Sequence, residues 1–252
     1  MLEVKLRAYA NIKNDRQREY KVENTHLLGG DVQLVTNYPN FNDMSPGNGG
    51  DASFEQIQND GENKGLYSYS LNDQYTLRSL SSIRLSFIDI VAKYRFYYKA
   101  LTSISTGQYQ GVFQRNYDLT PDHFMPAGII SIYDNRVLVG QSSLPDIPEN
   151  FTQSISVGRD NDVRYIVKGN LTSKSNRNTS IFFETYEIDV QVMNFKKKSV
   201  NTQLVFQRGI QIILGDTTCT SVAVDGNQLT LPVQLEQNYD HKCKFYVTVK
   251  LT

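Results

Sequence analysis

The feature that most constrains this chain is the alternation of apolar and polar residues along several segments. In an extended strand, successive side chains point to opposite faces, so an alternating segment has one buried and one wet face. Clear examples are residues 2–10, 186–192 and 244–251. No stretch shows the sustained spacing of an amphipathic helix with caps. The pattern therefore predicts an all-β protein built from antiparallel strands.

The spacing of the strands indicates how they are arranged. Strand-like segments recur at intervals of roughly 8–12 residues with turn signals between them, which is typical of sandwiches and barrels. We expect a β-sandwich with two tandem lobes, residues 1–153 and residues 154–252, the second of them immunoglobulin-like. Residues 40–65 are rich in Asn, Asp and Gly and are expected to form a flexible insertion, because they cannot bury enough apolar surface to offset their ordering entropy. The sequence shows no internal repeat.

One hairpin can be placed from its turn residues. Residues 128–133 and 136–140 are two short apolar segments, and Asp134 and Asn135 lie between them. These two residue types tolerate the positive φ angles of tight hairpin turns.

The same central segment carries a family resemblance. Residues 125–140, Met-Pro-Ala-Gly followed by strand, short turn, strand and glycine, resemble a signature of the β-domain at the C-terminus of mucoidy-inhibitor-type proteins. Similar features are residues 156–160, the Asn and basic turn within residues 192–200, and the closing strands within residues 229–251. Met125 stands where that family usually has leucine, and residues 40–65 depart from it. The resemblance implies a β module without established catalytic residues.

Charge and hydropathy exclude several classes of partner. Lysine plus arginine and aspartate plus glutamate number 26 each, so no overall field attracts nucleic acid. No apolar run reaches the roughly 18 residues that a membrane-spanning helix needs. The N-terminal segment lacks the hydrophobic block of a signal peptide, so a cytoplasmic location is the default expectation and an assembly such as a virion or surface layer is the other.

The residues that often carry chemistry stand alone in this sequence. His26, His123 and His241 have no metal-ligand spacing, and residues 160–162, Asp-Asn-Asp, lack the spaced pattern of a calcium loop and read as a turn that caps its own backbone. Residues 47–50, Gly-Asn-Gly-Gly, lack the strand and helix that flank a phosphate loop. We therefore predict no catalytic residues, no metal and no cofactor, and no enzymatic activity.

Two further features leave alternatives open. Cys219 and Cys243 are either free thiols in or near a core or a disulfide that links two late strands. The lysine run at residues 196–198 is expected to be a solvated turn that discourages edge pairing rather than a nucleic-acid contact.

The segment around Tyr94 is the candidate interaction surface. Tyr94, Arg95, Tyr97 and Tyr98 combine aromatic rings with a cation, which suits core packing, a protein interface or stacking on a sugar. The predicted function is a structural or protein-interaction module that acts in an oligomer or a larger assembly. A carbohydrate-binding domain, with envelope polymer as its ligand, is the alternative.

Overall fold

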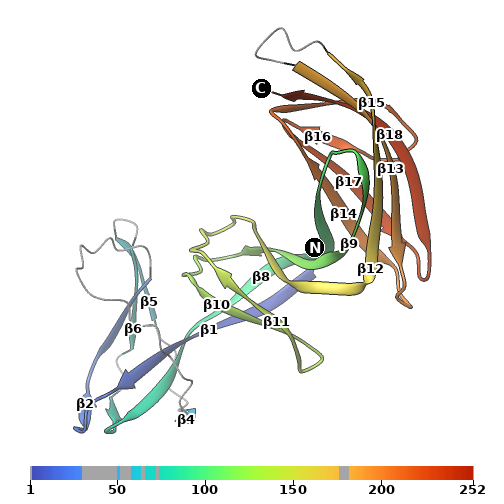
Figure 1. Cartoon of the computed structure of the whole chain (residues 1–252). Coiled ribbons are helices and arrows are strands. Elements are labelled where there is room, and N and C mark those ends of the chain that lie inside the picture. The colour runs from blue at the N-terminus through green and yellow to red at the C-terminus, as the bar shows by residue number, and fades with distance from the viewer. Residues whose placement is uncertain are drawn as a thin grey trace. The chain divides into compact units, whose positions relative to one another are not determined.

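The structure, a computed structural model, describes residues 2–29, 50–51, 58–63, 66–71, 74–175 and 182–251. Within these residues every regular element is a β-strand, so the predicted all-β class is confirmed (Figure 1). The described part contains no helix of the length and apolarity that crossing a membrane would need. The strands are β1 (Leu2–Asn14), β2 (Tyr20–Val22), β3 (Thr25–Gly29), β4 (Gly50–Asp51), β5 (Gln58–Asn63), β6 (Leu66–Leu71), β7 (Tyr75–Leu77), β8 (Ser81–Ser103), β9 (Gly107–Pro121), β10 (Gly128–Asp134), β11 (Val137–Leu144), β12 (Gln153–Lys174), β13 (Phe182–Asn194), β14 (Val200–Gln207), β15 (Gln211–Thr217), β16 (Ala223–Asp225), β17 (Gln228–Leu235) and β18 (Asp240–Leu251).

The chain forms two compact units that share the sequence in a different way from two consecutive lobes. The first unit contains Met1–Tyr94, Leu119–Ile130 and Ser143–Gln153, and the second contains the rest. The chain enters the second unit for the last time between Gln153 and Ser154, and the sequence predicts the boundary between the two lobes at this same point. The second unit also takes in Arg95–Asp118 and Ser131–Ser142. Arg95–Asp118 belongs to the second unit because β8 and β9, which are much longer than the usual five or six residues of a strand, contribute to both units.

The second unit is a sheet that doubles back on itself. Its strands follow the order β15-β18-β13-β12-β9-β8-β14-β17-β16, so four strands separate β18 from β14 along the sheet. Nevertheless the ring of Phe206 on β14 meets the ring of Phe245 on β18, with 5.3 Å between their centroids. The two ends of the sheet therefore face each other across a common core, as in a β-sandwich (Figure 1).

Alternation along the strands fills this core as the sequence predicts. On β13, Tyr186, Ile188, Val190 and Val192 are buried, and the residues between them are half-buried. Fully burying one such apolar side chain contributes about 1.5–3 kcal/mol relative to leaving it exposed. The alternation that predicts these strands is thus also what builds the sandwich core.

Parallel pairs correct the expectation of a purely antiparallel sheet, and besides β8 with β14 they include the short strand β4 with β8. The pairs β12–β13, β13–β18 and β14–β17 are antiparallel, but β8 and β14 run parallel, with Thr202 opposite Tyr98 and Gln207 opposite Ser103. The sheet is therefore mixed. Hairpin turns force antiparallel pairing only between consecutive strands, and about a hundred residues separate β8 from β14.

The first unit has its own core, around Tyr69, Leu71, Tyr75, Leu77 and Leu85. Strand β1 pairs with β8, β2 pairs with β7, and β3, β6 and β5 form a three-stranded sheet.

The predicted insertion at residues 40–65 lies in this unit, and only part of it is described. Gln58–Asn63 is strand β5, which pairs with β6, and Gly50–Asp51 is strand β4, which pairs with β8. Backbone hydrogen bonds to neighbouring strands thus order these two pieces although their side chains are polar. Residues 40–49, 52–57 and 64–65 lie outside the described residues.

A buried asparagine ends strand β1 and holds the turn that follows. The Nδ2 of Asn14 donates hydrogen bonds to the carbonyl oxygens of Arg18, at 2.7 Å, and Arg78, at 2.8 Å. Its Oδ1 accepts a hydrogen bond from the backbone N–H of Arg16 at 3.0 Å. One side chain therefore satisfies three backbone groups from two loops.

The same arrangement ends strand β13 in the second unit. The Nδ2 of Asn194 donates to the carbonyl oxygens of Lys198 and Glu236, both at 2.8 Å, and its Oδ1 accepts from the N–H of Lys196 at 3.0 Å. In both turns the sequence is Asn, any residue, a basic residue, any residue, a basic residue.

The loop that packs against each turn is also the same. Leu80 and Asn238 have φ angles of 49° and 50°, and each donates its N–H to the carbonyl oxygen of the first basic residue of the turn at 3.1 Å. The four strands around the first turn pair as β1–β8 and β2–β7, and those around the second as β13–β18 and β14–β17. The expectation of no internal repeat is therefore wrong at the level of structure, because this four-strand unit occurs twice.

Candidate functional site

Strand β8 carries the four residues of the candidate interaction surface. Tyr97 and Tyr98 are buried, Tyr94 is half-buried and Arg95 is exposed. Because Tyr97 and Tyr98 are consecutive in a strand, they point to opposite faces, so both faces of β8 are covered at this point. Burial removes Tyr97 and Tyr98 from any contact surface of the folded chain, and the core-packing interpretation holds for them. A sugar ring would find no exposed stacking face on either tyrosine.

Tyr97 and Arg95 instead hold a buried carboxylate. The Oδ2 of Asp118 accepts hydrogen bonds from Nε and Nη2 of Arg95, at 3.1 and 2.7 Å. Its Oδ1 accepts from the hydroxyl of Tyr97 at 3.0 Å and from that of Ser154 at 2.5 Å. Burial favours the neutral acid, but these hydrogen bonds outweigh it and hold the pKa of Asp118 below its ordinary value. The cluster fastens three strands together.

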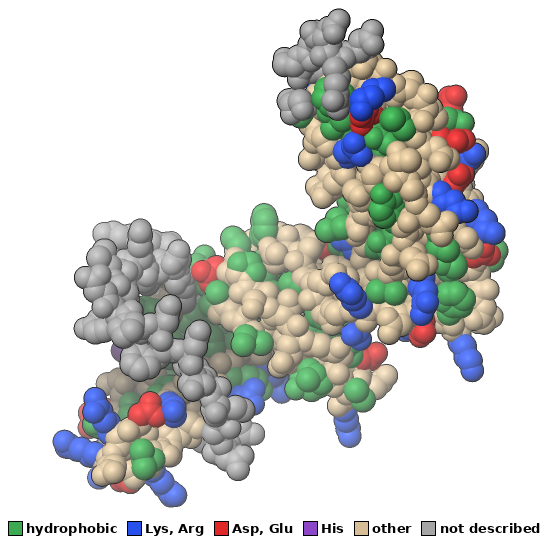
Figure 2. All heavy atoms as spheres, viewed as in Figure 1, with side chains coloured by type: hydrophobic (Ala, Val, Ile, Leu, Met, Phe, Trp, Pro, Cys, Tyr) green, Lys and Arg blue, Asp and Glu red, His purple; other side chains and the backbone are tan. Residues whose placement is uncertain are grey.

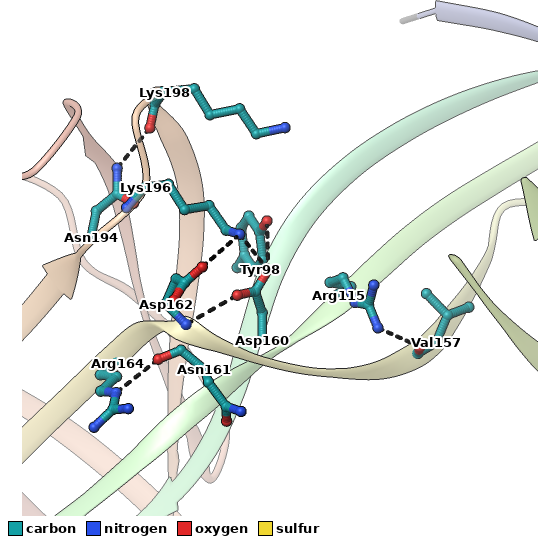
Figure 3. Close-up of polar contacts among 10 residues, drawn as sticks. All are labelled: Tyr98, Arg115, Val157, Asp160, Asn161, Asp162, Arg164, Asn194, Lys196 and Lys198. Carbon is teal, nitrogen blue, oxygen red and sulfur yellow. Dashed lines mark hydrogen bonds and ion pairs between the residues drawn. The ribbon is translucent and has the colours of Figure 1, made fainter. Parts of the chain in front are cut away.

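Tyr98 holds a second carboxylate, drawn in Figure 3. Its hydroxyl donates to Oδ2 of Asp160 at 3.1 Å, and the Nζ of Lys196 lies 2.9 Å from the same oxygen. The backbone N–H of Asp162 donates to Oδ1 of Asp160 at 3.1 Å. The predicted turn that caps its own backbone is therefore confirmed at residues 160–162. Burial raises the pKa of Asp160, but the hydrogen bonds, led by that from Lys196, leave it below the ordinary value.

The lysine run is solvated only in part. Lys197 and Lys198 are exposed, as predicted, but the side chain of Lys196 is largely covered and forms ion pairs with Asp160 and Asp162. The expectation of a wholly solvated turn is therefore wrong for Lys196, because the chain folds Asp160 from β12 against it (Figure 3).

A third carboxylate, the buried Glu184, has no signal in the sequence beyond its place in an alternating strand. Glu184 on β13 accepts from Lys174 at 2.5 Å, from the hydroxyl of Tyr186 at 2.6 Å and from Arg208 at 2.8 Å. The hydrogen bonds from Lys174 and Tyr186 lower its pKa. Glu184, Asp118 and Asp160 are all held as ionised anchors between strands.

The histidines and cysteines have separate locations. His26 lies on β3 and His241 lies on β18. The Nδ1 of His123 lies 3.1 Å from Oδ1 of the neighbouring Asp122. The described ranges hold no group of three acidic, histidine or cysteine side chains that could bind a metal ion. Cys219 and Cys243 form a disulfide, so the second of the two alternatives for the cysteines is the one observed.

The most exposed apolar feature among the described residues of the second unit is the tip of the hairpin of β10 and β11, since Ser131–Ser142 belong to this unit and the outer ends of the two strands to the first. Tyr133, Val137 and Leu138 around its turn are 64%, 67% and 49% exposed. Figure 2 shows apolar side chains at the surface interspersed with charged ones. The hairpin is as predicted, but the residues with positive φ are Asn135 (48°) and Arg136 (67°), one position later than the sequence suggested.

The foot of the hairpin is fixed in place. A Cβ atom at Gly140 would lie 2.5 Å from the carbonyl oxygen of Val157, so only glycine lets β11 come this close to β12. The Nε2 of Gln141 donates to the hydroxyl of Ser131 across the hairpin at 2.8 Å. A rigid base thus presents an exposed apolar tip. The sequence predicts the hairpin but not this exposure, because alternation does not show which face another element will cover.

Comparison of the chain with protein-family models, with curated proteins and with solved structures finds no match.

Proposed function

We propose that the protein is a non-catalytic structural module that associates with further copies of itself through the hairpin of β10 and β11. The observation that carries the proposal is the exposure of Tyr133, Val137 and Leu138 around one turn. Aromatic and apolar side chains gathered at an exposed position are typical of protein contact sites.

The backbone of the hairpin supports the same proposal. Strands β10 and β11 form a sheet of two, so among the described residues the outer edge of each strand has no strand partner. Edges of this kind accept a strand from another chain. Asn135 and Arg136 hold the positive φ angles, 48° and 67°, that a two-residue hairpin turn requires, so the turn keeps the two strands paired up to the exposed tip.

The charge of the chain favours a second copy as the partner. Positive and negative residues balance at 26 each, so copies do not repel one another through net charge. An extended assembly, such as a virion or a cell-surface layer, is the setting that we propose for this contact. The resemblance to the β-domain of mucoidy-inhibitor-type proteins is part of the proposal, since that domain is also a β module without established catalytic residues.

Light scattering coupled to size-exclusion chromatography, from low micromolar to near-millimolar protein, tests the proposal. We expect the mass to rise with concentration and Val137→Lys to return the protein to a monomer. The matched control is Ile213→Lys on β15, where the side chain is 47% exposed, and it should leave association intact. A strict monomer at the highest concentration, or equal loss of association in both variants, would refute the proposal.

A further inference from the structure

Tyr69 on β6 is a buried tyrosine whose hydroxyl has no hydrogen-bond partner among the described residues. The residue is only 3% exposed, and the ring of Phe87 packs edge-on against its ring with 5.3 Å between the centroids. Most buried polar groups in proteins have a partner, so an unpartnered hydroxyl calls for an explanation. Burial, followed by the charges of Tyr67 and Asp146, raises the pKa of Tyr69 to about 12, so the hydroxyl stays protonated at neutral pH.

Phe87 reaches this position through a β-bulge. Ala8 pairs with Ile88 in the ladder between β1 and β8. The next residue, Tyr9, pairs with Ser86, so Phe87 is an extra residue in β8 without an opposite partner. Bulges redirect a side chain, and they are frequent next to binding sites.

Tyr69 and Phe87 form part of the wall of a hollow of about 310 Å³ in the first unit. Tyr9, Leu27 and Asp146 also line this hollow and add an aromatic ring, an apolar side chain and a carboxylate to its wall. A second hollow of about 350 Å³ shares Tyr69 and Phe87 but is otherwise lined by different residues. The first hollow combines aromatic and apolar walls with one carboxylate, which is the usual make-up of a small-molecule site, and Tyr69, the residue with the unpartnered hydroxyl, is part of its wall.

The charge at the hollow is negative. Asp146 is half-buried, its Oδ1 accepts a hydrogen bond from the N–H of Ala127 at 2.7 Å, and it forms no ion pair with any described residue. None of the described residues that line the hollow is a lysine or an arginine. Tyr9 already receives a cation on its ring, because the guanidinium of Arg84 lies 3.9 Å from the ring centroid. An anion would be repelled here, whereas a cation would meet a carboxylate and aromatic rings.

We propose that this hollow binds a small organic ammonium ion. The carboxylate of Asp146 pairs with the positive charge, and the oxygen of the Tyr69 hydroxyl accepts an N–H from the ligand. The ring of Phe87, turned out of the ladder by the bulge, covers the apolar part of the molecule. The inference is independent of the proposed self-association, which involves the exposed tip of the hairpin, around Tyr133, Val137 and Leu138, and not the residues that line the hollow.

Calorimetric titration of the full chain with three probes of similar size tests the inference: phenethylammonium, phenylethanol and phenylpropionate. We expect saturable binding of phenethylammonium that is at least about tenfold tighter than that of phenylpropionate, since a hydrogen bond to a charged group is worth that much. Asp146→Asn, which keeps the size of the side chain, should weaken phenethylammonium about tenfold and leave phenylethanol unchanged.

The control variant is Asp122→Asn, because Asp122 lines the second hollow and not the first. It should bind all three probes as the unmodified protein does. Tyr69→Phe should weaken phenethylammonium and phenylethanol alike, because both donate to the hydroxyl. Preference for phenylpropionate or phenylethanol, no saturable binding of phenethylammonium, or affinity unchanged in Asp146→Asn would each overturn the inference.

Discussion

Replacing Asn194 by alanine tests how the repeated turn holds each unit together. Asn194 is 1% exposed and satisfies two carbonyl oxygens and one N–H at distances of 2.8 to 3.0 Å. Alanine leaves these backbone groups without their partner and without room for full hydration. At about 1 kcal/mol for each of the lost hydrogen bonds, the free energy of unfolding should fall by about 3 kcal/mol.

Urea unfolding is the assay, followed by circular dichroism and by tyrosine fluorescence, since the chain contains no tryptophan. For a slope of about 2 kcal/mol per molar urea, the loss moves the midpoint down by about 1.5 M. Asn14→Ala should cause a loss of similar size in the first unit, because its side chain makes the same bonds.

The control is Asn201→Ala, since Asn201 is exposed on the adjacent strand β14. Its midpoint should stay within about 0.3 M of that of the unmodified protein, as for most surface substitutions. A loss below about 1 kcal/mol for Asn194→Ala, or one equal to that of the control, would refute the assignment of the turn to this side chain.

Three further predictions concern buried groups. The pKa values of Asp118 and Asp160 lie below their unfolded values, so the stability that they contribute is complete above about pH 4 and is lost as the pH falls through the folded values. Unfolding free energy measured from pH 7 to pH 2 should therefore fall only at the acid end, and a flat profile would contradict this. Cys219→Ser removes a disulfide whose cysteines are 24 residues apart and should lower the free energy of unfolding, measured in urea, by about 3.5 kcal/mol. An unchanged free energy of unfolding would show that the thiols are free in solution. Tyr69→Phe removes an unpartnered hydroxyl and should raise the free energy of unfolding by about 1 kcal/mol, whereas Tyr75→Phe, which breaks a bond to a threonine hydroxyl, should lower it; a loss in Tyr69→Phe would show that its hydroxyl has a partner.

Much of the strand structure could be read from the sequence because alternation is a local property. Strands β13 and β18 bury the residues that the pattern assigns to the inside, for example Ile188 and Phe245. The turn at residues 160–162 was predictable for the same reason, since an aspartate caps a backbone N–H only two residues away.

The candidate site could be predicted only in part. Tyr94, Arg95, Tyr97 and Tyr98 do lie on one strand, but what covers each face of that strand depends on Asp118 and other distant residues. The repeated turn cannot be predicted from the sequence, because only Asn and two basic residues recur while the strands around it differ in sequence.

The alternation in the sequence is enough to predict that the chain forms strands, where several of them run and which of their side chains face inward, because the two-residue period of a strand is set by bonds between neighbours. Only the folded chain shows that β8 and β14 pair in parallel, that Cys219 meets Cys243, and that the hydroxyl of Tyr69 has no partner within the described ranges. These outcomes depend on contacts between residues far apart in the chain, and no local period encodes which distant strands will meet.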